Sequence, residues 1–347
     1  MSGRPARRRA ARAIAIAQVL ALALGLLAAR ALPAAGAAGS ATSEAGAAAG
    51  SPARPAEGAF AFALIGDVPS FRLEETMVDR ILGAFDEDLA FAIHVGDLKG
   101  GSERCDDALI AARRAQLDRS PVPLVYTPGD NDWTDCHRER AGGFDPLERL
   151  EALRSLFFAG PRALGGRGQA GGAPAAPALR SQADLSAGGP PENLRWRFGR
   201  VLFVTVNLPG SGDARQVELL HPGSSERRQR WNDAWLRDGY AIAGRDGLAA
   251  VVVIGHANPG FGSGERRSHA AFRRTLVELS SRFAGHTLFL HGDTHRHSVE
   301  RLGERLLRVE SHGSPFSDRW VRIDVDPAAP QPFRVSSRRI DPDPPMP

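Results

Sequence analysis

The sequence predicts an α/β protein in which buried strands alternate with amphipathic helices. Two observations support this class. Five apolar runs each lead into Gly followed by Asp or His, which is typical of a buried strand that presents a polar side chain at its C-terminal end. Between these runs, apolar residues recur at helical spacing, as at Met77, Val78, Ile81, Leu82 and Phe85.

The predicted elements fall into two runs along the chain. The first contains strands at 59–65, 89–95 and 122–126 and helices at 73–85, 106–117 and 146–158. The second contains a hairpin at 194–198 and 201–206, helices at 225–240 and 266–283, and strands at 249–254, 287–290, 305–309 and 320–325. The alternation in the first run predicts a largely parallel sheet with helices on its faces. Ligands of such sheets bind beyond the strand C-termini, where the polar motifs lie.

Residues 1–37 have the pattern of a secretory signal peptide. An Arg-rich start precedes an apolar run from Ala13 to Ala29, and the small residues that follow end in Ala35-Gly36-Ala37, a typical cleavage site. The alternative is an uncleaved anchor, but the run is short for a membrane span and contains Gln18. Cleavage would place the protein in the periplasm or outside the cell, with no stable membrane insertion.

The remaining boundaries follow from composition. Residues 38–58 are rich in Ala, Gly, Ser and Pro and predict a flexible linker to a domain at 59–326. Residues 159–192 are rich in Gly, Ala and Pro and predict a mobile insertion in that domain. Residues 327–347 are rich in Pro and predict a loose tail.

The charge of the chain argues against nucleic acid as a partner. The formal charge of the whole sequence is +4, but residues 1–37 hold six Arg and no acidic residue, so their removal leaves −2. A nuclease would need a basic groove that this composition does not predict.

The five motifs supply Asp, Asn and His, the residue types that hold hard and intermediate divalent metal ions. They read Ile65-Gly66-Asp67, Val95-Gly96-Asp97, Pro128-Gly129-Asp130-Asn131-Asp132, Ile254-Gly255-His256 and His291-Gly292-Asp293-Thr294-His295. Five such motifs at strand ends predict one convergent metal site, and two ions about 3.5–4 Å apart are a standard device for phosphoryl chemistry.

In the order of these motifs the chain resembles the calcineurin-like metallophosphoesterases, whose blocks read D-x-H, G-D, G-N-H-[D/E], G-H and G-H-x-H. The resemblance spans Asp67 to His295 and implies a sandwich of two sheets flanked by helices. It also implies two divalent ions. Asp67, Asp97 and His295 would hold the first, and the second would be held by Asp97, Asp130, His256 and Asp293. Four carboxylates and two imidazoles favour Mn or Fe over Zn.

The chain departs from the family pattern in three blocks. Pro69 replaces the His of the first block and cannot bind a metal. Asp293 replaces the first His of the last block, and its i,i+2 spacing from His295 on an extended segment should place both side chains on one side. In the third block, Asp130 replaces the metal-binding Asn, and Asn131 replaces the catalytic His. Asn131 can hydrogen-bond a phosphate oxygen but cannot act as a general acid. A shifted loop that brings Asn131 to the metal is the alternative.

Other polar residues follow the same strands. Asp132 would orient neighbouring loops, or it is a solvated turn residue. His94 is expected in the core, because it lies three residues from Asp97 on a strand and should face the other way. The candidate substrate contacts are Lys99, His137, Arg138, Asn207 and Asn258. Lys99 is the only Lys in the sequence, and a solvated loop position is the favoured alternative for it.

The two cysteines, Cys105 and Cys136, each follow a site motif. An even count in an exported chain predicts one disulfide between them, with two free thiols as the alternative.

The sequence therefore predicts an exported phosphoesterase that hydrolyses a small phosphorylated substrate through a metal-bound hydroxide. The alternative is a non-catalytic member of the family that binds metal or a phosphorylated ligand. Neither the substrate nor the oligomeric state follows from the sequence.

Overall fold

The computed structural model describes residues 58–166, 176–210, 213–262, 269–315 and 317–340. The predicted signal peptide and nearly all of the predicted linker lie outside these ranges. Within them, no helix combines the length and the apolar character that crossing a membrane would require.

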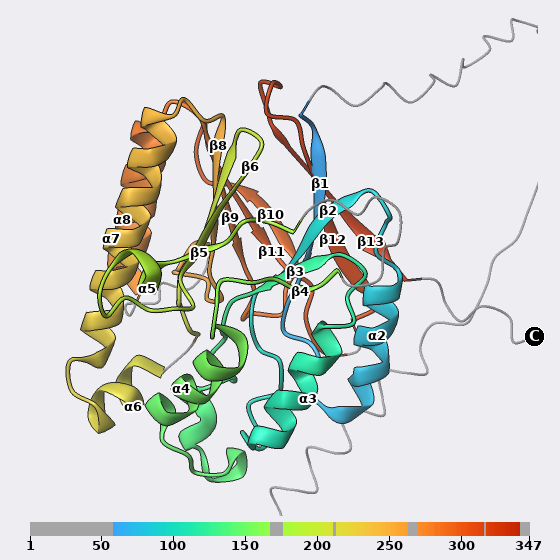
Figure 1. Cartoon of the computed structure of the whole chain (residues 1–347), viewed down its shortest axis with the longest axis vertical. Helices are drawn as coiled ribbons and strands as arrows, with labels where there is room; N and C mark the ends of the chain where they lie inside the picture. The colour runs from blue at the N-terminus through green and yellow to red at the C-terminus, as the bar shows by residue number, and fades with distance from the viewer. Residues whose placement is uncertain (1–57, 167–175, 211–212, 263–268, 316, 341–347) are drawn as a thin grey trace, which may run out of the picture. The chain divides into compact units, whose positions relative to one another are not determined.

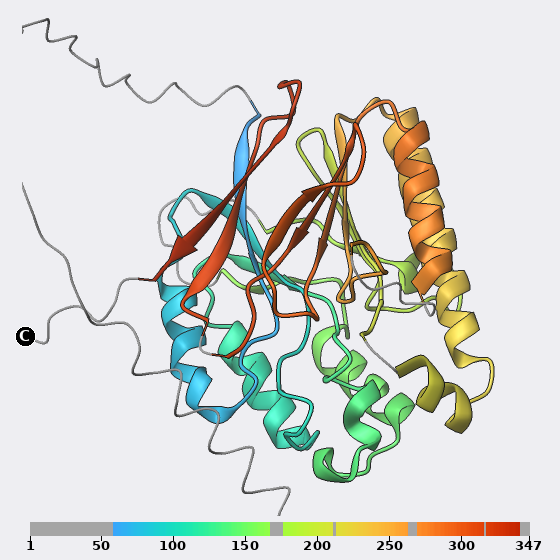
Figure 2. The ribbon, with the colours of Figure 1, turned by 180° about the vertical axis from the view of Figure 1, so that it is seen from behind.

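Two mixed sheets form the centre of the fold (Figures 1 and 2). The first runs in the order β13 (Phe333–Arg339), β12 (Arg319–Val325), β1 (Phe60–Ile65), β2 (Leu89–His94), β3 (Pro123–Tyr126) and β4 (Leu164–Gly165). The second runs in the order β10 (Ser298–Arg301), β11 (Leu306–Glu310), β9 (His286–His291), β8 (Ala250–Ile254), β7 (Val201–Thr205), β6 (Leu194–Phe198) and β5 (Arg180–Ser181). In each sheet the central strands pair in parallel and the outer strands, including β12 and β6, pair antiparallel.

Helices lie on the outer sides of both sheets (Figure 1). The longer ones are α2 (Glu75–Gly83), α3 (Asp107–Leu117) and α4 (Pro146–Phe157) beside the first sheet, and α7 (Ser224–Arg245) and α8 (Ala270–Arg282) on the second. The shorter ones are η1 (Arg72–Glu74), η2 (Thr134–His137), η3 (Glu139–Ala141), α5 (Gln182–Leu185) and α6 (Asp213–Leu220). The predicted class, an α/β sandwich of two sheets flanked by helices, is confirmed.

Alternation along the strands divides the core between the two faces of the second sheet. On β8, Val252 belongs to the apolar cluster between the sheets, whereas Val253 belongs to the cluster under α7 and α8. The rings of Phe62 on β1 and Phe203 on β7 meet edge to face, 5.5 Å apart, and join the sheets. Both faces of β8 are therefore buried, which fixes the position of the residues that follow it.

The structure corrects the expected tail and refines the expected insertion. Phe333–Arg339 is not loose: it forms β13, which pairs antiparallel with β12. Its alternation was hidden by exposed Arg and Ser residues, which are common on an edge strand. The described parts of 159–192 contribute β4, β5 and the short helix α5. Helix α6 and strand β10 were also not predicted.

Candidate metal centre

The motif loops of the two sheets meet beyond the C-terminal ends of β1, β2, β3, β8 and β9. Hydrogen bonds between these loops join the two sheets at this point. The Nδ1 atom of His256, after β8, lies 2.6 Å from the carbonyl oxygen of Val95, after β2. The backbone N–H of Asp293, after β9, donates to Oδ1 of Asp67, after β1, at 2.8 Å.

The backbone is unusual at four of the predicted ligands. Among the described residues, the non-glycine positions with a left-handed φ are Asp67 (57°), Asp97 (59°), Asp293 (74°) and His295 (58°). This conformation is costly for residues with a Cβ, and such strain is concentrated at functional sites. The chain thus maintains strained turns at the positions where the motifs predicted metal ligands.

The same observation corrects one expectation about the last motif. We expected Asp293 and His295 to project to one side of an extended segment. The strand β9 instead ends at His291, and both residues lie in left-handed turns. Their side chains consequently approach different partners.

Three buried side chains form the first compact group: Asp97, Asp130 and His256. The Nε2 atom of His256 lies 2.9 Å from Oδ1 of Asp130 and 3.3 Å from Oδ1 of Asp97. Since Nδ1 of His256 bonds the carbonyl of Val95, it must carry the proton of a neutral ring. Nε2 would then be an acceptor that faces two more acceptors, an arrangement that needs a cation or an added proton between them.

The second compact group shares Asp97 and adds Asp67 and His295. His295 repeats the arrangement of His256: its Nδ1 lies 2.7 Å from the carbonyl oxygen of Ser314, and its Nε2 lies 3.6 Å from Oδ1 of Asp67. A backbone carbonyl that holds one ring nitrogen while the other faces carboxylates is the usual setting of a metal-binding imidazole. The candidate ligand atoms of this group lie within 4.8 Å of one another.

Asp293 belongs to neither compact group but lies close to Asp130. A Cβ added to Gly210 would stand 2.2 Å from Oδ1 of Asp293 and 2.3 Å from Oδ1 of Asp130. The backbone N–H of Gly210 also donates to Asp130 at 3.2 Å. The two carboxylates therefore converge over a glycine, consistent with Asp293 joining the group of Asp130 and His256.

Glycine allows the same close approach at two other points. A Cβ at Gly129 would lie 2.1 Å from Oδ1 of Asp97, and one at Gly292 would lie 2.3 Å from Oδ2 of Asp67. The carboxylates occupy the space that a side chain would fill.

The electrostatics of the buried group also fit a cation. Burial, together with the neighbouring carboxylates, raises the pKa of Asp97 well above its usual range, although His256 opposes this. Burial acts to lower the pKa of His256, but the charge of Asp97 and the hydrogen bond to Asp130 outweigh it and raise that pKa well above its usual value. A divalent ion would supply the positive charge that these side chains otherwise obtain from a proton, so the residues fit the implied metals.

Asp132 fixes the loops that carry the ligands. It is buried and accepts hydrogen bonds from the backbone N–H groups of Asp97 (2.9 Å), Leu98 (2.7 Å) and Gly129 (2.7 Å) and from the hydroxyl of Tyr126 (2.7 Å). The expectation that Asp132 orients neighbouring loops is confirmed, and the alternative of a solvated turn residue is wrong.

Asn131 binds the carboxylate that the two groups share. Its backbone N–H donates to Oδ1 of Asp97 at 3.0 Å and its side-chain Nδ2 donates to Oδ2 of Asp97 at 2.5 Å. Asp130, not Asn131, faces His256, so the third loop is not shifted by one residue. A Cβ at Gly101 would lie 2.7 Å from Oδ1 of Asn131 and 2.8 Å from Nη1 of Arg138, which places these two side chains next to each other.

The two cations Lys99 and Arg138 lie in different surroundings. Lys99 is not solvated: it is fully buried, its Nζ donates to the carbonyl of Gly100 at 3.0 Å, and burial lowers its pKa. Arg138 is half exposed and pairs with Asp135, with Nη1 2.6 Å from Oδ2. Among the suggested substrate contacts, Arg138 is the cation that reaches the rim of the site.

The other suggested contacts use their side chains elsewhere. Nδ1 of His137 lies 2.6 Å from the carbonyl of Thr134. Asn258 caps its own loop, accepting from the N–H of Phe261 and donating to its carbonyl. Asn207 is buried and donates to Glu192 at 2.8 Å. As expected, His94 is also a buried core residue, with Nε2 3.0 Å from the carbonyl oxygen of Val68.

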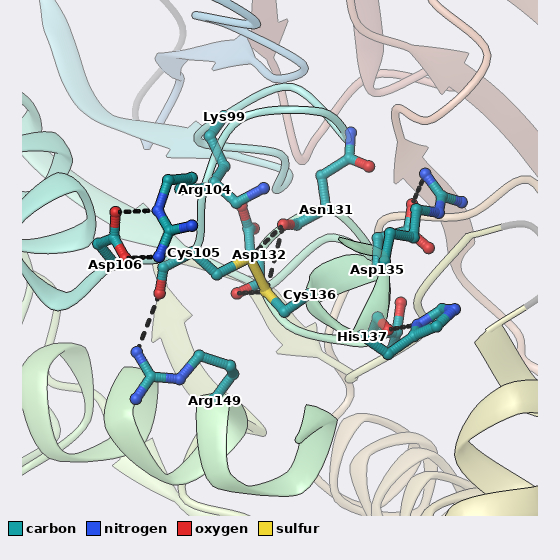
Figure 3. The surroundings of a disulfide bond; sticks show 12 residues. Lys99, Arg104, Cys105, Asp106, Asn131, Asp132, Asp135, Cys136, His137 and Arg149 are labelled. Atoms are coloured by element: carbon teal, nitrogen blue, oxygen red, sulfur yellow. Dashed lines mark hydrogen bonds and ion pairs between the residues drawn. A yellow bond between two sulfur atoms is a disulfide. The ribbon is translucent and has the colours of Figure 1, made fainter. Parts of the chain in front are cut away.

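The predicted disulfide between Cys105 and Cys136 is present (Figure 3). It links the loop after β2 to the turn η2, and both cysteines are buried. Their sulfur atoms lie 3.8 and 3.9 Å from the carbonyl oxygen of Asn131. The bridge therefore packs directly against the loop that carries Asp130 and Asn131.

Residues after β11 also support the site but were not predicted. Oγ of Ser311 donates to Oδ2 of Asp67 at 3.2 Å, and the N–H of Ser314 donates to the carbonyl of Asp67 at 3.1 Å. Glu74, fully buried, accepts from Oγ of Ser314 and from the N–H of Ser70. The signal in the sequence was a sixth apolar run, before Ser311, that ends in polar residues and Gly.

Comparison with known proteins gives structural neighbours alone, since no family model and no curated protein matches the chain. A dimetal phosphatase from Danio rerio aligns at 12% identity, covering 81% of this chain and 99% of its own, with a TM-score of 0.44. A putative 5'-nucleotidase from Staphylococcus aureus aligns at 14% identity, covering 83% of this chain and 55% of its own, with a TM-score of 0.48. An anchor of the inner membrane complex of Plasmodium aligns at 12% identity, covering 82% and 90%, with a TM-score of 0.45.

Proposed function

We propose that this protein is an exported, metal-dependent phosphoesterase with a dinuclear site. The observation that carries the proposal is the pair of Asp/His groups that share Asp97, each with an imidazole Nε2 aimed at carboxylate oxygens. The order of the motifs, which resembles that of the metallophosphoesterases, supports the same activity. When bound, two ions would lower the pKa of a water ligand and offset negative charge on phosphoryl oxygens.

The residues of the chain have separable roles in this proposal. Asp67, Asp97 and His295 would hold one ion, and Asp97, Asp130, His256 and Asp293 the other. Asp132 positions the loops of Asp97 and Asp130 through its four hydrogen bonds. Asn131, beside Arg138, orients the shared carboxylate. Arg138 would offer its guanidinium to a phosphate oxygen at the rim, where it remains half exposed.

A second candidate, a non-catalytic protein that binds metal or a phosphorylated ligand, is favoured by one observation. Asn131 carries no titrating proton, and its amide nitrogen is already directed to Asp97. No acid is therefore supplied from this position to a leaving group, and turnover would depend on the chemistry of the ester.

The test that separates the two candidates combines metal analysis with phosphate release. Purified mature protein should contain Mn or Fe in preference to Zn, because the ligand set is rich in carboxylates. With those ions it should release phosphate from an activated aryl phosphate, whereas the Asp97→Ala variant should not. Stoichiometric metal with no turnover on any ester would establish the non-catalytic candidate.

Export is proposed from the pattern of residues 1–37. Intact-mass analysis of protein from the native host should show a chain that begins after Ala37. A cytosolic protein that retains Met1 would contradict this proposal without affecting the proposed chemistry.

A further inference from the structure

Left-handed turns at two of the predicted ligands need support from the rest of the fold. A left-handed residue that has a Cβ persists only where the surrounding contacts hold its backbone in place. For Asp97 (φ 59°) this support comes from Asp132, which accepts from the backbone N–H groups of Asp97 and Leu98. The turn of His295 (φ 58°) lies on a different loop, after β9. A different residue must therefore hold it.

The carboxylate of Glu310 binds both chain neighbours of His295. Its Oε1 atom accepts a hydrogen bond from Oγ1 of Thr294 and another, of 3.2 Å, from the backbone N–H of Arg296. One oxygen thus bridges the residue before His295 and the residue after it. The backbone of the left-handed residue is held from both sides, while its Nε2 atom still faces Asp67.

The place of Glu310 in the second sheet makes this bridge rigid. Glu310 is buried, it is the last residue of β11, and it lies opposite His291 at the end of β9. Its other oxygen, Oε2, lies 3.9 Å from Nε2 of His291. Farther along the same segment, the carbonyl oxygen of Ser314 lies 2.7 Å from Nδ1 of His295. The end of β11 therefore holds His295 by its backbone and by its ring.

Glu310 is not placed as a ligand itself. Among the described residues, neither compact group of candidate metal ligands includes it. Its Oε1 is used by two hydrogen bonds to the turn. A carboxylate in such a position acts on a metal ion through the ligand that it orients.

We propose that Glu310 is a positioning residue for the ion of the second compact group. It fixes the turn of His295 so that Nε2 is directed to Asp67 before an ion binds. Asp132 has the corresponding role for the turn of Asp97. Each turn is thus built over a buried carboxylate that binds the loop and not the metal. The inference rests on the proposed dinuclear site, but it does not depend on hydrolysis.

Two substitutions separate the hydrogen bonds of Glu310 from its charge. Glu310→Leu removes both, whereas Glu310→Gln keeps an amide oxygen that can accept from Thr294 and Arg296. The first measurement is amide hydrogen exchange in the chelator-treated full chain, which requires neither metal nor activity. Exchange at Arg296 should become roughly tenfold faster in Glu310→Leu, the effect of one lost hydrogen bond. It should stay close to the wild-type rate in Glu310→Gln.

The second measurement is a titration of the same proteins with Mn²⁺ alone. Wild type should bind two ions, and Glu310→Leu should bind one of them roughly 10–100-fold more weakly, the usual effect of losing a partner that orients a ligand. The Kd of the other ion should change by less than about twofold, because Asp130 and His256 lie on other loops. Glu310→Gln should bind both ions with affinities close to those of wild type.

Two further variants assign the weakened ion and guard against misfolding. Asp67→Ala removes a ligand of the second compact group, so adding Glu310→Leu to it should not weaken the ion that remains. Thr294→Val removes one of the two hydrogen bonds and leaves Glu310 in place. It should weaken the same ion by a smaller factor, and it carries the test if Glu310→Leu does not fold.

Glu300→Leu is the matched control, because it removes an acid from β10, the strand beside β11. The Glu300 side chain is 43% exposed and pairs with Arg308, with Oε2 3.3 Å from Nη2. Exchange at Arg296 and both Kd values should change by less than about twofold, the scale of an exposed ion pair.

Several results would overturn the proposal. One is a folded Glu310→Leu variant that leaves both ions unchanged or weakens both equally. Another is an equal loss in Glu310→Gln and Glu310→Leu, which would mean that the charge acts and the hydrogen bonds do not. A wild-type protein that binds no Mn²⁺ would overturn it together with the metal centre. Two bound ions without phosphate release from any ester would remove only the proposed phosphoesterase activity.

Discussion

The two halves of the candidate metal centre differ in how firmly the fold holds them. The buried half consists of Asp130 and His256, and the open half of Asp67 and His295, with Asp97 shared between them. The side chain of His256 is 0% exposed and lies 2.9 Å from its carboxylate, whereas that of His295 is 33% exposed and lies 3.6 Å from its carboxylate. In the proposed dinuclear site we therefore expect the buried half to bind its ion tightly and the open half to exchange its ion and meet the substrate.

The difference has its origin in the strands that precede each imidazole. His256 follows β8, which is buried on both faces between the sheet interface and the helices. His295 lies between β9 and β10, and β10 is an edge strand with partly exposed side chains. The open half also has Pro69 where the resemblance would place another ligand. Fewer ligands and more water both weaken the hold on an ion.

The largest effect is expected from the shared ligand. Asp97→Ala should remove most of the bound metal and lower turnover by about a thousandfold or more, since several kcal/mol of charge stabilisation depend on the ions. Asp67→Ala should remove about one ion. Elemental analysis of both variants decides this, with Asp107→Ala as a control, because Asp107 is an acid whose side chain is 81% exposed. Equal, small losses in Asp97→Ala and Asp67→Ala would mean that the assignment of the two halves is wrong.

The next effect concerns the missing acid at Asn131, beside the shared Asp97. With Asn131 in the place of a proton donor, the leaving oxygen must depart as an anion or take its proton from water. Aryl phosphates tolerate this and alkyl phosphates do not, so kcat/KM should depend steeply on the leaving-group pKa. Asn131→His should flatten that dependence, with a gain of up to about 10²–10⁴ on alkyl esters.

Two features of the structure bear on this experiment. Asn131 also orients Asp97, so the histidine variant must first be shown to keep its metal. If the unmodified enzyme shows no dependence while chemistry limits the rate, another residue supplies the proton. His137, one of the suggested substrate contacts, has Nδ1 directed to Thr134, whereas Arg138 is the neighbour that lies beside Asn131.

The two halves should also differ, by a smaller amount, in how their affinity for metal depends on pH. The pKa of His256 is raised by Asp97 and Asp130 despite its burial, so the metal-free ring holds a proton at neutral pH that an ion must displace. Affinity for the buried ion should therefore rise with pH until that proton is lost. His256→Asn should lower the affinity for this ion by roughly 10–100-fold or more and make that affinity less dependent on pH. His295→Asn should leave the affinity for the buried ion unchanged. An affinity that does not depend on pH in the wild-type protein would contradict the assignment of this ion to His256.

Much of this centre could be predicted from the sequence because its ligands follow strands. An apolar run that ends in Gly and a polar residue indicates both a buried strand and the point where that strand ends. Parallel strands place their C-terminal ends at the same edge of the sheet. This was sufficient to identify Asp67, Asp97, Asp130 and His256 as candidates. It was not sufficient for the last motif, where left-handed turns at Asp293 and His295 replace the extended segment that we expected.

Other features depended on tertiary packing, which local patterns do not encode. From its sequence neighbours, Lys99 was expected in a solvated loop, but its side chain is buried. Ser311 supports Asp67 from a segment far away in the sequence, and Glu74 accepts a hydrogen bond from Ser314 of that same segment. Strand β13 has too many exposed polar residues to be recognised before its partner β12 is known. In each case the deciding partner is distant along the chain.

The smallest effect on turnover is expected from removing the disulfide. The loss of metal affinity should be confined to the buried half. The bridge joins the loop after β2, which carries Asp97, to the turn that follows Asp130 and Asn131. Cys105→Ser/Cys136→Ser should lower the free energy of unfolding by about 3–4 kcal/mol in the chain-entropy model. At temperatures where the variant stays folded, Asp132 still fixes both loops, so kcat/KM should fall by less than about tenfold.

Denaturant unfolding and metal titration of the double variant and of its oxidised parent measure the two quantities. The affinity for the buried ion should decrease while that for the ion at Asp67 and His295 stays the same, because the bridge touches no residue of the open half except the shared Asp97 through its loop. An equal loss at both ions would show that the disulfide stabilises the whole domain and has no particular hold on the loop of Asp130. Unchanged stability would mean that the bridge does not constrain the unfolded chain as its position implies.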